Sequence, residues 1–120
     1  MTLYPLRKYY IGFISGFSIY MNIPRPTNNS YTIYTKSGCG YCTKAKELLQ
    51  NEHPQPLIVN CDGYLTHNKP EFLNQMHALI GREYRTFPMI FKNGIFMGGY
   101  TETKKVYDQS QILAYNDSDF

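Results

Sequence analysis

After residue 30, the spacing between hydrophobic residues changes several times along the chain, and each change marks one expected helix or strand. Short β-prone runs favour strands at residues 31–35, 57–61, 89–91 and 95–97. Apolar residues three and four positions apart favour helices at about residues 41–51, 68–80 and 101–115. This order predicts an α/β fold in which a parallel β-α-β unit precedes a β-hairpin and a last helix.

Residues that start and stop secondary structure support the same order. Asn68 is a good N-cap for the second helix, Pro70 suits its first turn, and Gly81 suits the position after its last turn. Asn93-Gly94 is a strong signal for a tight hairpin between the last two strands. We therefore expect a four-stranded mixed sheet with helices on both faces.

The first thirty residues differ from the rest, so we divide the chain into an N-terminal extension and linker (1–30) and a folded domain (31–120). Two basic residues precede an uncharged run over residues 9–24. Four interpretations stay open: an appended non-catalytic segment, a true start at Met21, a targeting signal, or a membrane anchor. We favour the first, because the run is shorter than the roughly 20 apolar residues of a membrane span and no small-x-small cleavage site follows it.

Charge and cysteine content narrow the partners and the compartment. The net charge is +3, but residues 1–30 hold three of the 12 Lys and Arg, and the other nine balance nine Asp and Glu. The chain therefore has no cluster of basic residues of the kind that binds nucleic acid. Three cysteines are too few for a secreted disulfide scaffold. We therefore expect a cytoplasmic protein, with an organelle or the cytoplasm of a virus-infected host as alternatives, and no membrane partner.

The candidate chemistry lies in Cys39-Gly40-Tyr41-Cys42, between the first strand and the first helix. A helix N-terminus carries about half a positive charge, which stabilises an anion placed there. The Cys39 thiol should therefore have a lowered pKa and be nucleophilic near neutral pH. Cys42 lies one turn later, close enough to attack a mixed disulfide formed on Cys39.

Two cysteines at this spacing can also form half of a zinc site. Structural zinc needs four ligands, however, and the three histidines have no finger-like spacing. The remaining cysteine, Cys61, ends the second strand, where a small core residue is the ordinary role. We therefore expect redox chemistry and no protein-only metal site.

Three segments resemble one family when taken together and in order. Residues 34–42 resemble the active-site stretch of glutaredoxins, Thr86-Phe87-Pro88 resembles their Thr-Val-Pro, and residues 98–102 resemble their Gly-Gly motif with a following acid. Thioredoxins, the nearest competitor, typically have a tryptophan before Cys-Gly-Pro-Cys, and this chain has neither. The resemblance implies the thioredoxin fold and activity with glutathione, a tripeptide with two carboxylates and one ammonium group.

The resemblance also implies where glutathione binds. Lys36 can pair with a carboxylate and favour the Cys39 thiolate, Tyr41 can flank the tripeptide, and Arg85 can supply a second cation. A cis bond before Pro88 would turn the Phe87 backbone toward the thiols, where it can pair with the cysteine moiety as an added strand does. Thr86 opens this loop.

The γ-glutamyl end of glutathione is expected at the Gly-Gly segment. Gly99 lets the backbone approach closely, and the amides of Thr101 and Glu102 can hold the γ-glutamyl carboxylate. The Glu102 side chain can reach the ammonium group. Arg82-Glu83-Tyr84 make the approach to Thr86 longer than is usual in the family.

The resemblance thus predicts a glutathione-disulfide oxidoreductase that reduces protein disulfides and glutathione mixed disulfides through Cys39. Glutathione is the expected co-substrate, and glutathionylated or disulfide-bonded proteins are the expected partners of a monomer. The alternative is a [2Fe–2S] carrier or sensor, in which Cys39 from each of two subunits and two glutathiones hold the cluster. Gly40, a non-proline residue after the first cysteine, keeps that alternative open.

Overall fold

The structure is a computed structural model and describes residues 21–118. Its elements, in chain order, are β1 (Tyr31–Thr35), α1 (Gly40–Leu49), β2 (Leu57–Asn60), α2 (Asp62–Ile80), β3 (Met89–Lys92), β4 (Ile95–Gly98) and α3 (Tyr100–Ser118). The predicted β-α-β-α-β-β-α order is confirmed, with strand bounds within one residue of the expected ones. The targeting, anchor and start-site interpretations of residues 1–20 lie outside the described residues.

The four strands form one mixed sheet in the order β2-β1-β3-β4. β1 and β2 are parallel, while β1 pairs with β3 and β3 with β4 in antiparallel fashion. The hairpin between β3 and β4 turns at Asn93 (φ 52°) and Gly94 (φ 83°), the two positive φ values that a type I′ turn needs. This topology is that of the thioredoxin fold.

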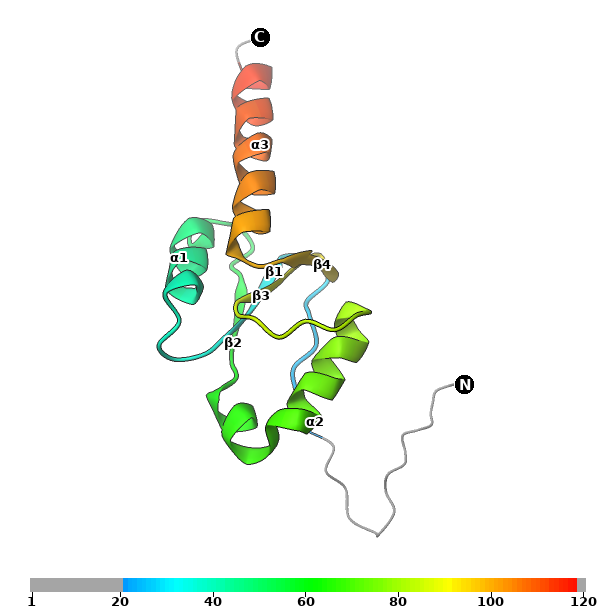
Figure 1. Cartoon of the computed structure of the whole chain (residues 1–120). Helices are drawn as coiled ribbons and strands as arrows, with labels where there is room; N and C mark the ends of the chain where they lie inside the picture. The colour runs from blue at the N-terminus through cyan, green and yellow to red at the C-terminus, as the bar shows by residue number, and fades with distance from the viewer. Residues whose placement is uncertain (1–20, 119–120) are drawn as a thin grey trace, which may run out of the picture.

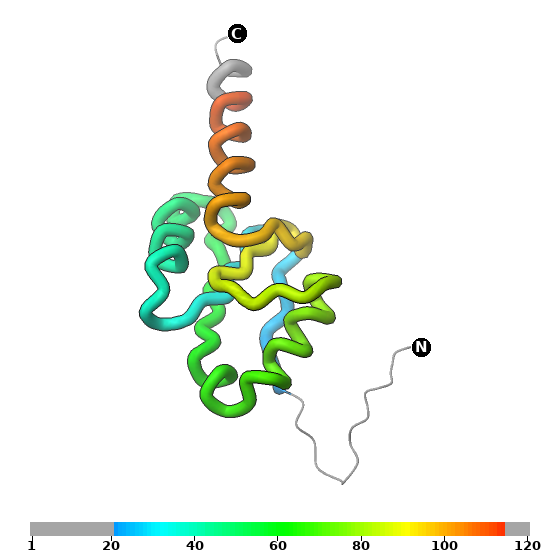
Figure 2. The backbone as a smooth tube through the Cα atoms, viewed as in Figure 1, coloured from blue at the N-terminus to red at the C-terminus, as the bar shows by residue number. Residues whose placement is uncertain are grey.

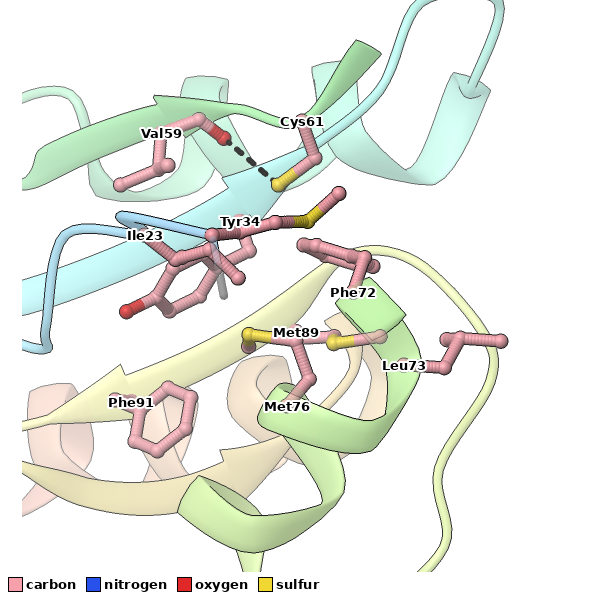
Figure 3. Close-up of a cluster of buried hydrophobic side chains, with 10 residues drawn as sticks. Ile23, Tyr34, Val59, Cys61, Phe72, Leu73, Met76, Met89 and Phe91 are labelled. Atoms are coloured by element: carbon pink, nitrogen blue, oxygen red, sulfur yellow. Dashed lines mark hydrogen bonds between the residues drawn. The ribbon is translucent and has the colours of Figure 1, made fainter. Parts of the chain in front are cut away.

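Helices cover both faces of the sheet, as predicted: α1 and α3 lie on one face and α2 on the other (Figure 1). Because successive strand residues point to opposite faces, Ile33 and Ile90 pack toward α1 and α3, whereas Tyr34 and Met89 pack toward α2. The α2-side cluster contains Phe72 and is drawn in Figure 3. Helix α3 extends beyond the sheet (Figure 2).

Helix α2 begins earlier than predicted. It starts at Asp62 and is interrupted at Asn68, whose φ of −161° and ψ of 83° are not helical. The predicted N-cap is nevertheless present for the longer second part, because Asn68 Oδ1 accepts a hydrogen bond from the Glu71 amide at 3.2 Å. The first part was missed because it is too short to show a period. Tertiary contacts hold it: the Tyr64 ring stacks on Phe72 with centroids 5.9 Å apart.

Residues 21–30 pack against the domain before β1 begins. Met21 and Ile23 are buried at 6% and 9% exposure and belong to the α2-side core. The Tyr34 hydroxyl donates a hydrogen bond to the Pro24 carbonyl at 2.6 Å, and the Tyr64 hydroxyl donates to the Asn22 carbonyl at 3.2 Å. Residues just before the expected linker therefore contribute to the core, and the domain division at residue 31 stays a prediction.

An Ile23→Ala variant should lower the free energy of unfolding by about 2 kcal/mol, the lower range for deleting a buried aliphatic side chain at the edge of a core. Equilibrium unfolding in urea measures the change. Asn22→Ala is the matched control, since the Asn22 side chain is exposed, and it should change stability by less than about 0.5 kcal/mol. Equal unfolding midpoints for the two variants would show that the segment does not support the core.

No helix within residues 21–118 is both long enough and apolar enough to span a bilayer.

Candidate active site

Cys39 is the N-cap of α1. Its backbone is extended (φ −108°, ψ 105°), and the helix proper begins at Gly40. Its sulfur accepts a hydrogen bond from the Cys42 amide at 3.1 Å, in the way that an Asp or Ser side chain caps a helix. This donor and the positive end of the helix dipole both favour a negative charge on the Cys39 sulfur.

Cys39 and Cys42 are joined by a disulfide, with Cα atoms 5.2 Å apart. Their exposure differs: Cys39 is half-buried, whereas Cys42 is 1% exposed and packs under the first turn of α1. An incoming disulfide can therefore reach the first sulfur and not the second. The arrangement can close and open one intramolecular disulfide.

The loop before β3 faces the Cys39 sulfur. The Phe87–Pro88 peptide bond is cis, as predicted, and the Phe87 carbonyl oxygen lies 3.7 Å from Cys39 Sγ. Pro88 is buried, and the Phe87 ring stacks on Phe72 of α2 with centroids 6.1 Å apart. The backbone of this loop is thereby held next to the sulfur that would carry a bound substrate.

The two predicted cations have different surroundings. Lys36 is exposed, and its ammonium nitrogen lies 5.5 Å from the centre of the Phe87 ring. Arg85 is also exposed but forms an ion pair with Glu83, its Nε donating to Glu83 Oε2 at 2.9 Å. This guanidinium holds the pKa of the Glu83 carboxyl below its usual range. Lys36 therefore places a cationic charge over the Phe87 ring, while the charge of Arg85 already has a partner.

Tyr41 lies in an aromatic pair that the sequence did not indicate. Its ring is 56% exposed and stacks on Tyr100 at the start of α3, with centroids 5.8 Å apart. The Lys44 ammonium lies 5.2 Å from the Tyr41 ring centre and 5.9 Å from that of Tyr100. The pair links the beginnings of α1 and α3 beside the two cysteines.

The Gly-Gly segment lies beside the loop that ends at Pro88. Gly98 has φ +117°, and a side-chain carbon on Gly99 would lie 3.6 Å from the Pro88 carbonyl oxygen. The Gly99 amide donates to Glu102 Oε1 at 2.9 Å, which is half of a capping box at the start of α3. Thr101 is exposed in the same turn. The Glu102 carboxylate that we expected to reach a ligand ammonium is thus engaged with the backbone here.

Asp62 is a site-supporting residue that the sequence analysis missed. One carboxylate oxygen accepts from the Ser37 amide at 2.9 Å, and the other accepts from the Ser37 hydroxyl. These bonds tie the loop between β1 and Cys39 to the start of α2. A signal was available: β1 and β2 are parallel neighbours, so residues that follow their ends lie at one edge of the sheet.

The hydrogen bonds from Ser37 lower the pKa of Asp62 from its ordinary 3.8. A carboxyl with a lowered folded-state pKa contributes stability above its unfolded-state pKa, and this contribution is lost as the pH falls through the folded-state value. The stability difference between the wild type and Asp62→Asn should therefore be larger at pH 6 than at pH 2, as measured by urea unfolding. Glu47→Gln, which removes an exposed carboxylate on α1, is the control. A difference that does not vary with pH would contradict this role.

The remaining thiol and the histidines lie outside this group. Cys61 is fully buried, as expected, and burial raises its pKa to about 12. Within residues 21–118, no three His, Cys, Asp or Glu side chains gather as a metal site would need. The [2Fe–2S] alternative draws only Cys39 from each subunit, and in this structure the Cys39 sulfur is bonded to Cys42. Cluster binding therefore stays a prediction without support.

The chain is similar to known glutaredoxins in sequence and structure. Residues 31–97 match the glutaredoxin family model. Mitochondrial glutaredoxin-2 of Bos taurus is 33% identical over 87 residues, which cover 72% of this chain and 53% of the relative. Chloroplastic glutaredoxin-C5 of Arabidopsis thaliana is 36% identical over 80 residues, covering 67% of this chain and 44% of the relative. The chain thus spans about half the length of these relatives.

The crystal structure of glutaredoxin 1 from Francisella tularensis superposes with a TM-score of 0.57 at 28% identity, covering 68% of this chain and 94% of that protein. The family model matches more than half of the chain and includes both cysteines of the disulfide, the Phe87–Pro88 loop and the hairpin. The chain belongs to the glutaredoxin family.

Proposed function

We propose that this protein is a glutathione-dependent thiol–disulfide oxidoreductase that reduces protein disulfides and glutathione mixed disulfides. The observation that carries the proposal is the Cys39 sulfur, which caps a helix, bonds to buried Cys42 and lies 3.7 Å from the Phe87 carbonyl. The family supports the thiol–disulfide chemistry and the use of glutathione as reductant.

The residues around Cys39 offer a partner to each charged group of the tripeptide. Lys36 offers an ammonium group to the glycyl carboxylate, and the Phe87 backbone offers hydrogen bonds to the cysteine moiety. The backbone amides of Thr101 and Glu102, in the first turn of α3 after Gly99, are offered to the γ-glutamyl carboxylate. Tyr41 flanks the ligand on the α1 side. Arg85 contributes less than Lys36 in this scheme, because Glu83 already neutralises it.

The reaction proceeds by two exchanges. The Cys39 thiolate attacks the glutathione sulfur of a mixed disulfide, so the Cys39–glutathione bond forms while the substrate thiolate leaves and takes up a proton. The thiolate of a second glutathione then attacks the glutathione sulfur of this adduct, which releases glutathione disulfide and restores the Cys39 thiolate. One free glutathione is oxidised for each glutathione mixed disulfide reduced, because the other half of the glutathione disulfide comes from the substrate; reduction of a protein disulfide oxidises two free glutathiones. With a protein disulfide, Cys42 can attack the mixed disulfide on Cys39 and close the bond seen here.

A coupled assay tests the proposal. The full chain is supplied with a glutathionylated peptide, and electrons come from NADPH through either glutathione and glutathione reductase or thioredoxin reductase. We expect turnover with glutathione and none with thioredoxin reductase alone. Turnover with thioredoxin reductase and none with glutathione would overturn the assignment.

The relatives also bear on where the protein works. The two compared above are named mitochondrial and chloroplastic, so the cytoplasmic expectation receives no support from them. We infer an organellar location for a monomeric enzyme. A full-length fusion to a fluorescent protein tests the location, with diffuse cytoplasmic signal as the contrary outcome, and light scattering of the purified chain tests the monomer.

A further inference from the structure

The segment between α2 and β3, which we expect to be longer than is usual in the family, carries one aromatic residue, Tyr84, that several neighbours hold in place. Its carbonyl accepts a hydrogen bond from His77 Nε2 at 3.0 Å. Its ring packs edge-to-face on Phe96 of β4, with centroids 4.9 Å apart. The Arg82 guanidinium lies over both rings, 5.2 Å from the centre of Tyr84 and 5.6 Å from that of Phe96. These contacts therefore fix the backbone of Tyr84 and both the face and the edge of its ring.

The Tyr84 hydroxyl is directed at the Gly-Gly segment. A side-chain carbon on Gly99 would meet the Tyr84 oxygen at 3.1 Å, Glu102 Oε1 at 3.4 Å and the Pro88 carbonyl oxygen at 3.6 Å. The phenol thus reaches the turn that joins β4 to the start of α3. Within residues 21–118 this hydroxyl has no hydrogen-bond partner, although Gly99 and Glu102 on either side of it are bonded to each other.

The Tyr84 side chain is half-buried and held in place by its neighbours, and its hydroxyl is free to donate a hydrogen bond to a bound ligand. We propose that Tyr84 is a specificity-determining residue of the glutathione site, whose hydroxyl donates a hydrogen bond to the γ-glutamyl carboxylate. This inference rests on the proposed function. It assigns a role to the lengthened segment: His77 and Phe96 position the phenol, and the phenol recognises the end of the tripeptide farthest from the reacting sulfur.

Two mixed disulfides of one reporter thiol separate this role from simple packing. One carries glutathione, and the other carries cysteinylglycine, which lacks the γ-glutamyl group. The ratio of kcat/KM for the first to kcat/KM for the second should fall about tenfold in Tyr84→Phe, the order expected for a hydrogen bond to a charged group, with the loss mainly in KM. Tyr107→Phe removes a phenol hydroxyl on the α3 side of the sheet and should leave the ratio unchanged.

The outcomes distinguish this inference from the proposed function. If the wild type reduces both compounds with no preference for glutathione, the proposed function itself fails. If the wild type prefers glutathione and Tyr84→Phe keeps the whole preference, the role of Tyr84 is wrong. An equal loss with both compounds, together with a lowered melting temperature, would show that the hydroxyl serves only the fold and would also overturn the inference.

Discussion

A Cys39→Ser variant is expected to lose thiol–disulfide exchange completely, with glutathione mixed disulfides and protein disulfides alike. A serine hydroxyl cannot form a disulfide and stays protonated at neutral pH. Neither remaining thiol can replace Cys39, because Cys42 is 1% exposed and Cys61 is fully buried with a pKa raised to about 12. The coupled glutathione assay should therefore show no rate above the uncatalysed reaction.

Cys61→Ala is the matched control for the loss of one sulfur. The Cys61 sulfur lies 3.6 Å from the Val59 carbonyl oxygen (Figure 3), belongs to the α2-side core and is not part of the Cys39–Cys42 disulfide. This variant should keep exchange activity, with at most a modest loss of stability. Residual catalysis by Cys39→Ser would show that another nucleophile operates. Loss of activity in a folded Cys61→Ala protein would show that Cys61 takes part.

The strands and the hairpin could be predicted from the sequence because local chemistry decides them. Each β-prone run shows the residue pattern of a strand without reference to the rest of the chain. Asn93-Gly94 selects one turn geometry almost by itself. Gly81 likewise ends α2 in the left-handed conformation, with its amide donating to the His77 carbonyl at 2.8 Å. Such features depend on a few neighbouring residues and are visible without the fold.

The parts that were missed depend on contacts between distant residues. The first part of α2 is held by Tyr64, which stacks on Phe72 and donates to the Asn22 carbonyl. Ile23 is buried because it packs in the core cluster on the α2 side of the sheet. In the sequence, residues 24–30 have the composition of a linker, and only the packed core shows that the chain just before them is buried.

The site residues also fall into two groups, those that the sequence indicates and those that depend on contacts between distant residues. The two cysteines, Pro88 and Gly99 lie in short sequence motifs, so the sequence alone indicates them as candidate site residues. Asp62 and Tyr84 lie in no motif, and each acts on a segment far away in the chain: Asp62 on Ser37, and Tyr84 at Gly99. Their importance comes from side-chain geometry, which the one-dimensional pattern does not contain.

A Cys42→Ser variant is expected to separate the two reactions of the site. It should keep reduction of a glutathionylated peptide, because that cycle needs only the Cys39 thiolate and one free glutathione in addition to the substrate. The hydrogen bond to the Cys39 sulfur comes from the backbone amide of residue 42 at 3.1 Å, so the substitution preserves this donor. Reduction of an intramolecular peptide disulfide should fall sharply, because no thiol remains to resolve the mixed disulfide from within the protein.

Rates with the two peptides, measured side by side in the coupled assay, test this separation. Mass spectrometry of the variant mixed with glutathione disulfide adds a direct observation, since one glutathione should stay bound to Cys39 when no neighbouring thiol displaces it. Thr43→Ser, an exposed change one residue further along α1, is the control and should keep both activities. Complete loss of deglutathionylation in Cys42→Ser would contradict the one-cysteine route. Both peptide reductions would then have to pass through the Cys39–Cys42 disulfide, and the buried second thiol would be an obligatory part of every turnover.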